Sequence, residues 1–347
     1  MAQKKLIKDA AGTIISYFKE YNYKLRLYCI STDGDAHRLR ALASLTLSQM
    51  PSESSSLYSK SKSLKLLNLF CGHGEITSDF DWKHVLKCFR NALLRINGST
   101  VNGEYIRATG IQKHLVDSGL LKADMASKWL NPNDRQDIVL MFYLLNAISK
   151  LPEAPEDSSP TYTSAQNVLR LLGSLYGHLL NTYTNVHLSL CDQLMHTSAA
   201  MHITCAIYRI DKTGFIPSQL MYDVQSMGKT TYFNVAKTQI DDPNGSFWII
   251  QQGTDALEKL FGNVQTMVGT DSNVGLYQLG GRLTSAIETE KILADNPSWN
   301  PTPQRLNIPT ISQQVDISQK YDHINVSLWK GNCSVKDIIL RTPWDQG

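Results

Sequence analysis

Two acidic residues, Asp81 and Glu258, occupy positions from which a carboxylate could hold a divalent cation. Asp81 stands directly before a segment with helical periodicity, and Glu258 lies in the first turn of a second predicted helix, 177 positions later. Enzymes that cut and join DNA phosphodiesters use two divalent cations clamped by carboxylates, which activate the nucleophile and stabilise the leaving oxygen. Mg²⁺ prefers such hard oxygen ligands. The two residues could therefore contribute to metal-dependent phosphoryl transfer.

The same two positions also have a purely structural explanation. An Asp before a helix is commonly an N-cap, and a Glu in a first turn complements the positive end of the helix dipole. The basic residues that follow Asp81 at intervals close to one helical turn leave a similar choice open. These residues are Lys83, Lys87, Arg90 and Arg95. They could face the phosphates of a nucleic acid, or they could form an ordinary solvated helix face.

The segments that must position Asp81 alternate between predicted helices and strands. Apolar residues recur at helical spacing over 5–20, and strand-like runs follow at 24–30 (KLRLYCI) and 63–72 (SLKLLNLFCG). The helix after Asp81 has an apolar face made of Val85, Leu86, Phe89, Leu93 and Leu94. This order of strand, acidic residue and helix predicts that Asp81 lies at the edge of a sheet.

Glu258 follows a long helical stretch. Helical periodicity dominates from about 105 to 235, and SFWIIQQ (246–252) is predicted to be a short strand. Thr254 then has the side chain of an N-cap for the helix that contains Glu258. The last part of the chain, 291–347, is rich in Pro and Asn and predicts short elements and extended arms.

Composition limits the class of protein without identifying its partner. The 347 residues are 42% hydrophobic and 19% charged, as in globular proteins, and the net charge of +3 is too small to indicate DNA binding by bulk charge. Six scattered cysteines without a CxxC pair favour a reducing, intracellular compartment. No signal peptide and no apolar run long enough for a membrane span are present, so we expect a protein that is neither secreted nor membrane-bound.

The residues around Asp81 and Glu258 resemble two blocks of the P-element-like DNA transposases and their fungal relatives. SDFDWKHVLKCFRNAL (78–93) is similar to a D-x-x-H-x-x-K-x-x-R-N pattern that opens on the second catalytic aspartate of that family. GTDALEKLFGNVQTMVGTDSNV (253–274) is similar to a D-x-L-E-x-x-F-G-x-x-R block that contains the catalytic glutamate. Further blocks follow in the family's order, so the resemblance covers about 20–347.

The resemblance implies a site and its partners. Asp81 and Glu258 would be catalytic and would bind Mg²⁺ or Mn²⁺. Supporting roles would fall to Asp255, His84, Lys87 and Arg90. The substrate would be DNA in the nucleus, and the chain could associate with copies of itself or with full-length relatives.

Several departures from the family weaken the expected activity. The first catalytic aspartate would precede the strand at 24–30, and the zinc-binding module of such transposases is also missing, so we expect an amino-terminally truncated fragment. Asp33 and Asp35 could lie near the site, although turn and N-cap roles suit them better. GTP binding, known in the P-element branch, is not expected, because SMGKTT (226–231) lacks the first glycine of a phosphate-binding loop.

These observations predict an α/β protein with a large all-α insertion, mostly helical overall, built on an incomplete RNase H-like core of a mixed sheet flanked by helices. The expected divisions are a partial core at 1–104, a helical insertion at 105–235, a return to the core at 236–290 and a carboxy-terminal extension at 291–347. The predicted function is that of a transposase-derived protein, inactive as this fragment. The alternative is a non-catalytic transposon remnant that binds DNA or protein.

Overall fold

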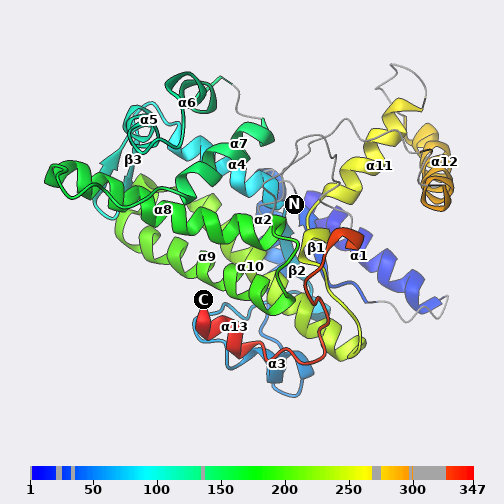
Figure 1. Ribbon diagram of the computed structural model, residues 1–347. Helices are drawn as coiled ribbons and strands as arrows, with labels where there is room; N and C mark the ends of the chain where they lie inside the picture. Colours follow the sequence, from blue (N-terminus) through cyan, green and yellow to red (C-terminus); the bar gives the residue numbers. More distant parts are fainter. Residues whose placement is uncertain are drawn as a thin grey trace.

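Helices form most of the chain, and two short pairs of strands accompany them (Figure 1). The computed structural model describes residues 2–20, 26–32, 36–133, 137–267, 275–296, 299 and 326–347. The amino-terminal elements are α1 (Ala2–Glu20), β1 (Cys29–Thr32), α2 (Ala36–Thr46), α3 (Ser56–Ser61), a 3-10 turn (His73–Glu75), β2 (Thr77–Phe80), α4 (Trp82–Leu93), β3 (Ser99–Val101) and β4 (Glu104–Ile106).

The second part of the chain is helical. Its elements are α5 (Ala108–Asp117), α6 (Ala123–Trp129), α7 (Ile138–Ser149), α8 (Pro160–Thr184), α9 (Leu190–Asp211), a 3-10 turn (Lys212–Gly214), α10 (Ser218–Asp241), a 3-10 turn (Ile249–Gln251), α11 (Asp255–Thr266), α12 (Leu276–Asp295), a 3-10 turn (Val326–Leu328) and α13 (Arg341–Gln346). Within the described ranges, no helix combines the length and apolar character needed to cross a bilayer.

The strands β1 and β2 form a parallel pair in which Cys29 faces Thr77 and Thr32 faces Phe80. Parallel strands need a crossover connection, and here α2, α3 and the loop before β2 supply it. The strands β3 and β4 form a separate antiparallel hairpin whose turn residues, Asn102 and Gly103, both have positive φ. Each sheet contains two strands in the described part of the chain.

Helix α10 holds the parallel strand pair in place. It packs against β2, α4 and α9, and Figure 1 shows α8, α9 and α10 lying side by side. Its Thr230 hydroxyl donates to the carbonyl oxygen of Ser78 at 2.6 Å, and the buried Lys229 and Lys237 side chains donate to the carbonyl oxygens of Phe70 and Tyr28. Burial lowers the pKa of both lysines to about 8.

The GKT tripeptide at 228–230, which in other proteins ends a phosphate-binding loop, lies within α10 in this structure.

Aromatic side chains join α4 to the helical block. The ring of Trp82 stacks on that of Tyr183 with centroids 5.0 Å apart, and Phe89 meets Tyr176 edge to face. All four side chains are buried. Such pairs add to the free energy gained by burying apolar area.

The helices predicted over 5–20, after Asp81 and after Thr254 are confirmed, and α5 to α10 occupy the stretch predicted to be helical. The strand predicted at 24–30 is confirmed in part, since β1 begins at Cys29.

Two strand predictions are wrong. Residues 63–72 form turns and an extended loop, and Leu66 has a φ of 69° with 96% of its surface exposed. The strand next to Asp81 is instead β2. In 246–252, the buried Ile249 and Ile250 belong to a 3-10 turn, because a short apolar run is equally compatible with a buried strand and a buried helical turn.

Phe89 anchors α4, so its truncation tests this packing. We expect Phe89→Ala to lower the free energy of unfolding by about 3–5 kcal/mol, because it leaves a cavity among buried rings. Urea denaturation monitored by circular dichroism measures the loss. The control is Ile96→Ala, at a side chain that is 94% exposed, which should cost less than about 0.5 kcal/mol. Equal losses in the two variants would contradict this account of the core.

Candidate functional site

Asp81 lies immediately after β2 and is the N-cap of α4. Its Oδ1 accepts a hydrogen bond from the main-chain N–H of His84 at 2.9 Å, and the side chain is 4% exposed. The structural explanation considered for this residue is therefore correct. It does not exclude a second role, because the other carboxylate oxygen is directed elsewhere.

Thr254 brings Asp81 and Glu258 together. Its hydroxyl oxygen lies 3.3 Å from Asp81 Oδ2 and 3.3 Å from Glu258 Oε1, and its main-chain N–H points to the same Asp81 oxygen at 3.4 Å. A hydroxyl has one proton to donate, so it serves one carboxylate at a time. Asp81 and Glu258 thus flank a single oxygen atom although 177 positions separate them in the sequence. Thr254 precedes α11 as expected, but its hydroxyl points to these carboxylates and does not cap the helix.

Asp79 is a third carboxylate at this place, and the sequence analysis missed it. It is fully buried, and its Oδ2 accepts hydrogen bonds from the Gly253 N–H at 2.9 Å and the Ser31 hydroxyl at 3.2 Å. Its Oδ1 is buried without a hydrogen-bond partner among the described residues. Burial is the main cause that raises the pKa of Asp79, to about 7. The alternation of side chains along a strand could have suggested that Asp79 shares a face with Asp81, but not that both meet the turn at Gly253.

Gly253 lets the chain pass close to both aspartates. Its φ is +100°, a backbone conformation that residues with a side chain rarely adopt. An added Cβ would lie 3.1 Å from Asp81 Oδ2 and 3.4 Å from Asp81 Cα. The turn before α11 therefore requires glycine at this position.

Asp255 and Lys83 form a buried ion pair between α11 and α4. Their side chains are 5% and 7% exposed, and Lys83 Nζ donates to Asp255 Oδ1. Asp255, predicted to support Glu258, thus lies beside the site and is held by a cation of the next helix. The pair fixes α11 against α4 and, with it, the position of Glu258.

The basic residues of α4 do not form a phosphate-facing stripe. Arg90 is fully buried, and its Nη2 donates to the carbonyl oxygens of Trp129 at 3.0 Å and Asn131 at 3.2 Å. Arg95 donates to the main-chain carbonyls of residues 213–215. Lys87 is half-buried. The alternative prediction of a solvated helix face is also wrong, because Lys83 and Arg90 are buried. Arg90 is hydrogen-bonded to main-chain oxygens.

Of the remaining predicted residues, His84 meets the cluster through its main-chain N–H, which Asp81 caps, and two others lie outside the described chain. His84 is half-buried, and its Nε2 is 3.4 Å from the Cys88 sulfur on the next turn of α4. Asp33 and Asp35 lie outside the described residues.

The arrangement offers two carboxylates that could bind a cation. Asp81 and Glu258 converge, but nowhere in the described part of the chain do three His, Cys, Asp or Glu side chains come close enough to hold a metal ion. Asp79 lies beside the two residues, but the three side chains do not come close enough together to hold one ion. Two carboxylates beside one hydroxyl fit a loosely held divalent cation and not a closed pair of ions.

The raised pKa of Asp79 predicts a pH-dependent stability. Between about pH 4 and pH 7, folded Asp79 keeps a proton that the unfolded chain has lost, so its contribution to stability is present below pH 4 and is lost as the pH rises to about 7. Asp79→Asn stays neutral throughout. We expect the difference in free energy of unfolding between the variant and the wild type to change by on the order of 1–4 kcal/mol over this range.

Urea denaturation at a series of pH values measures this difference. Asp124→Asn, at an exposed position in the first turn of α6, is the control and should follow the wild-type profile. Parallel profiles for Asp79→Asn and the wild type would show that Asp79 ionises as an ordinary carboxyl.

Comparison with known proteins gives a likeness in fold. No family model matches the sequence, and no curated protein matches it. The structure is similar to a chain of the Drosophila P element transposase strand transfer complex, with a TM-score of 0.53 and 14% sequence identity. The match covers 83% of this chain and 64% of that chain. This chain thus shares a mostly helical fold with a solved transposase and spans about two thirds of its length.

Proposed function

We propose that this chain derives from a cut-and-paste DNA transposase and carries two of the three carboxylates of its catalytic core. The observation that supports this most is the meeting of Asp81 and Glu258 at the Thr254 hydroxyl. Both residues were selected from sequence patterns similar to transposase blocks, and the fold brings them to the same oxygen atom. The likeness in fold to a P element transposase supports the same assignment.

The RNase H-like core is part of this proposal. It would consist of β1, β2, α4 and α11, interrupted by the helices of 105–235. Two hydrogen bonds across the helical block support this. Asp79 and Asp81 lie before the block in sequence, and they accept hydrogen bonds from the main-chain N–H groups of Gly253 and Thr254, which lie after it. The segment 291–347 would be an extension of this core, and the division into these parts remains a prediction.

Mg²⁺ or Mn²⁺ would be held by Asp81 and Glu258. Bound there, such an ion would supply Lewis-acid stabilisation of charge at a phosphodiester. Asp81 and Glu258 would provide oxygen ligands, Lys83 would hold Asp255 and α11 in place, and Thr254 would orient the two carboxylates. Two ligands seldom fix a pair of ions in the geometry of in-line attack, so a third carboxylate is required. The chain by itself is then inactive.

A non-catalytic role is the second candidate. The incomplete ligand set favours it, as does the use of Lys83 and Arg90 in internal contacts. In this role the chain would bind DNA in the nucleus, or pair with itself or with full-length relatives, without cutting DNA. GTP is not part of either proposal.

The carboxylate pair predicts weak binding of Mn²⁺. Isothermal titration should detect one site that is weakened about tenfold or more in both Asp81→Asn and Glu258→Gln, because each variant removes a charged oxygen ligand. Glu153→Gln is the control, since Glu153 is 80% exposed and remote in sequence from both blocks. Binding that is unchanged in both site variants would remove the metal from the proposal.

Strand transfer tests the inactivity directly. The purified chain, incubated with labelled DNA ends, a target plasmid and Mg²⁺ or Mn²⁺, should give no joined product above the background of Asp81→Ala. The physical reason is the missing third ligand. A metal-dependent product that disappears in Asp81→Ala would refute the inactivity and would identify the chain as a working transposase.

A further inference from the structure

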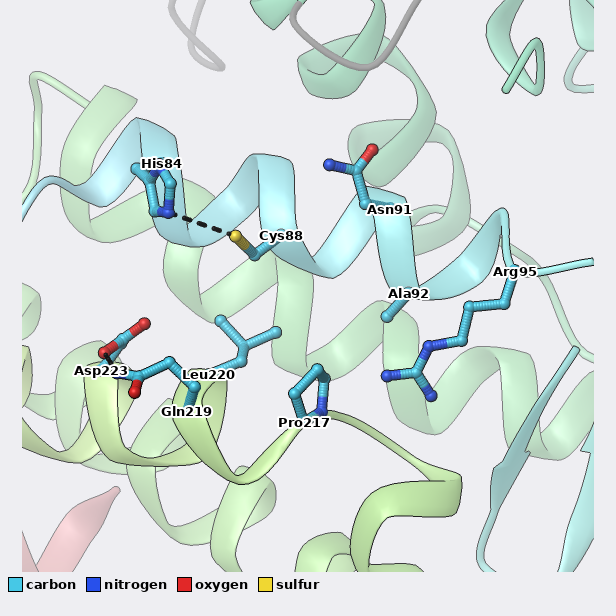
Figure 2. A pocket seen from close by; sticks show the side chains of 9 residues that line it. All are labelled: His84, Cys88, Asn91, Ala92, Arg95, Pro217, Gln219, Leu220 and Asp223. Carbon is cyan, nitrogen blue, oxygen red and sulfur yellow. Dashed lines mark hydrogen bonds between the residues drawn. The ribbon is translucent and has the colours of Figure 1, made fainter. Parts of the chain in front are cut away.

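A second site lies between α4 and the amino-terminal part of α10. It is a half-open pocket of about 250 Å³, slightly smaller than the usual range for small-molecule sites (Figure 2). The α4 wall presents side chains spaced along one helix face, and the opposite wall begins at Pro217. The residues that line it are His84, Cys88, Asn91, Ala92, Arg95, Pro217, Gln219, Leu220 and Asp223.

Asp223 is a desolvated carboxyl without a counter-charge among the described residues. It is 2% exposed, and its Oδ1 accepts a hydrogen bond from Gln219 Nε2 at 2.5 Å. Burial raises the pKa of Asp223 to about 7, and the one influence that opposes it is the Gln219 hydrogen bond, not a nearby cation. Further along α4, the Oδ1 of Asn91 is buried and has no hydrogen-bond partner among the described residues. The α10 wall therefore offers a buried carboxyl, and a buried carboxylate without a counter-charge is costly.

Neither Arg95 nor Cys88 neutralises Asp223. Figure 2 shows the Asp223 side chain on the α10 wall, across from His84 and Cys88, with Arg95 at the other end. The Arg95 guanidinium donates to main-chain carbonyls of residues 213–215. Burial, with the charge of Asp223, raises the pKa of the Cys88 thiol to about 11, which makes it a poor nucleophile. A metal ion is disfavoured, because no three ligating side chains in the described ranges come together.

We propose that this pocket binds a small organic cation of the amidinium, guanidinium or primary ammonium class. The positive group would donate to Asp223, and the apolar part of the ligand would pack against Leu220 and Pro217. Charge-assisted hydrogen bonds to a buried carboxylate are stronger than neutral ones. A cation would also remove the cost of keeping that carboxylate unpaired. The site is separate from the carboxylate pair at Thr254, and the inference does not depend on the proposed transposase origin.

Benzamidine and benzamide provide a matched pair of probes, since they share shape and differ in charge. Isothermal titration and thermal unfolding of the full chain at pH 8, where Asp223 is mostly ionised, should show benzamidine binding with at least about tenfold higher affinity than benzamide. Asp223→Asn should abolish this preference, because the amide keeps the size of the side chain and loses its charge. Asp124→Asn, an exposed carboxyl on α6, should keep it.

The wild-type comparison decides the outcome even if Asp223→Asn does not fold. Equal affinity for the two probes, or no binding of benzamidine at millimolar concentration, would overturn the proposal. Tight binding of Zn²⁺ with no benzamidine binding would also overturn it, in favour of a metal site. Arginine amide and an arginine-containing tripeptide then distinguish a free cation from a protein side chain. Tighter binding of either probe than of the same molecule with citrulline in place of arginine, which lacks the positive charge, supports recognition of a cation by Asp223.

Discussion

The candidate site depends on how two buried aspartates hold one turn. Asp79 and Asp81, at the end of β2, accept hydrogen bonds from the main chain at Gly253 and Thr254. Hydrogen bonds from main-chain N–H groups to buried carboxylates stabilise the contact between β2 and this turn. They also give partners to N–H donors that would otherwise be buried without one. Because this turn begins α11, the contact sets where Glu258 lies. Gly253 is needed there, since its φ of +100° is strained for any residue with a side chain and an added Cβ would lie only 3.1 Å from Asp81 Oδ2.

The interior cations form a second constraint on the structure. Lys229 and Lys237 of α10 and Arg90 of α4 donate to main-chain carbonyls, and Lys83 pairs with Asp255. These bonds connect loops and helices that are distant in sequence, and they offset the cost of burying charge. Their consequence for function is that this part of α4 does not present its positive charge to a nucleic acid. Any DNA surface must use other residues of the chain.

Helix α4 links the two sites of the molecule. Its N-cap, Asp81, belongs to the carboxylate pair, and His84, one turn later, already lines the pocket that continues to Arg95. The helix is anchored between them by the stacking of Trp82 on Tyr183 and the burial of Phe89. A ligand in the pocket would therefore contact the same helix that carries Asp81, although the two sites use different side chains.

The helices could be predicted from the sequence, because their apolar periodicity is a local property, and motifs selected Asp81 and Glu258 as candidates. The sequence did not determine the strands correctly: 63–72 and 246–252 are too short for periodicity to separate a strand from a buried turn or loop. Tertiary structure alone decided the role of Asp79, the burial of Arg90 and the pairing of Lys83 with Asp255. These depend on contacts between residues far apart in the chain, and no local pattern of residue types encodes such distances.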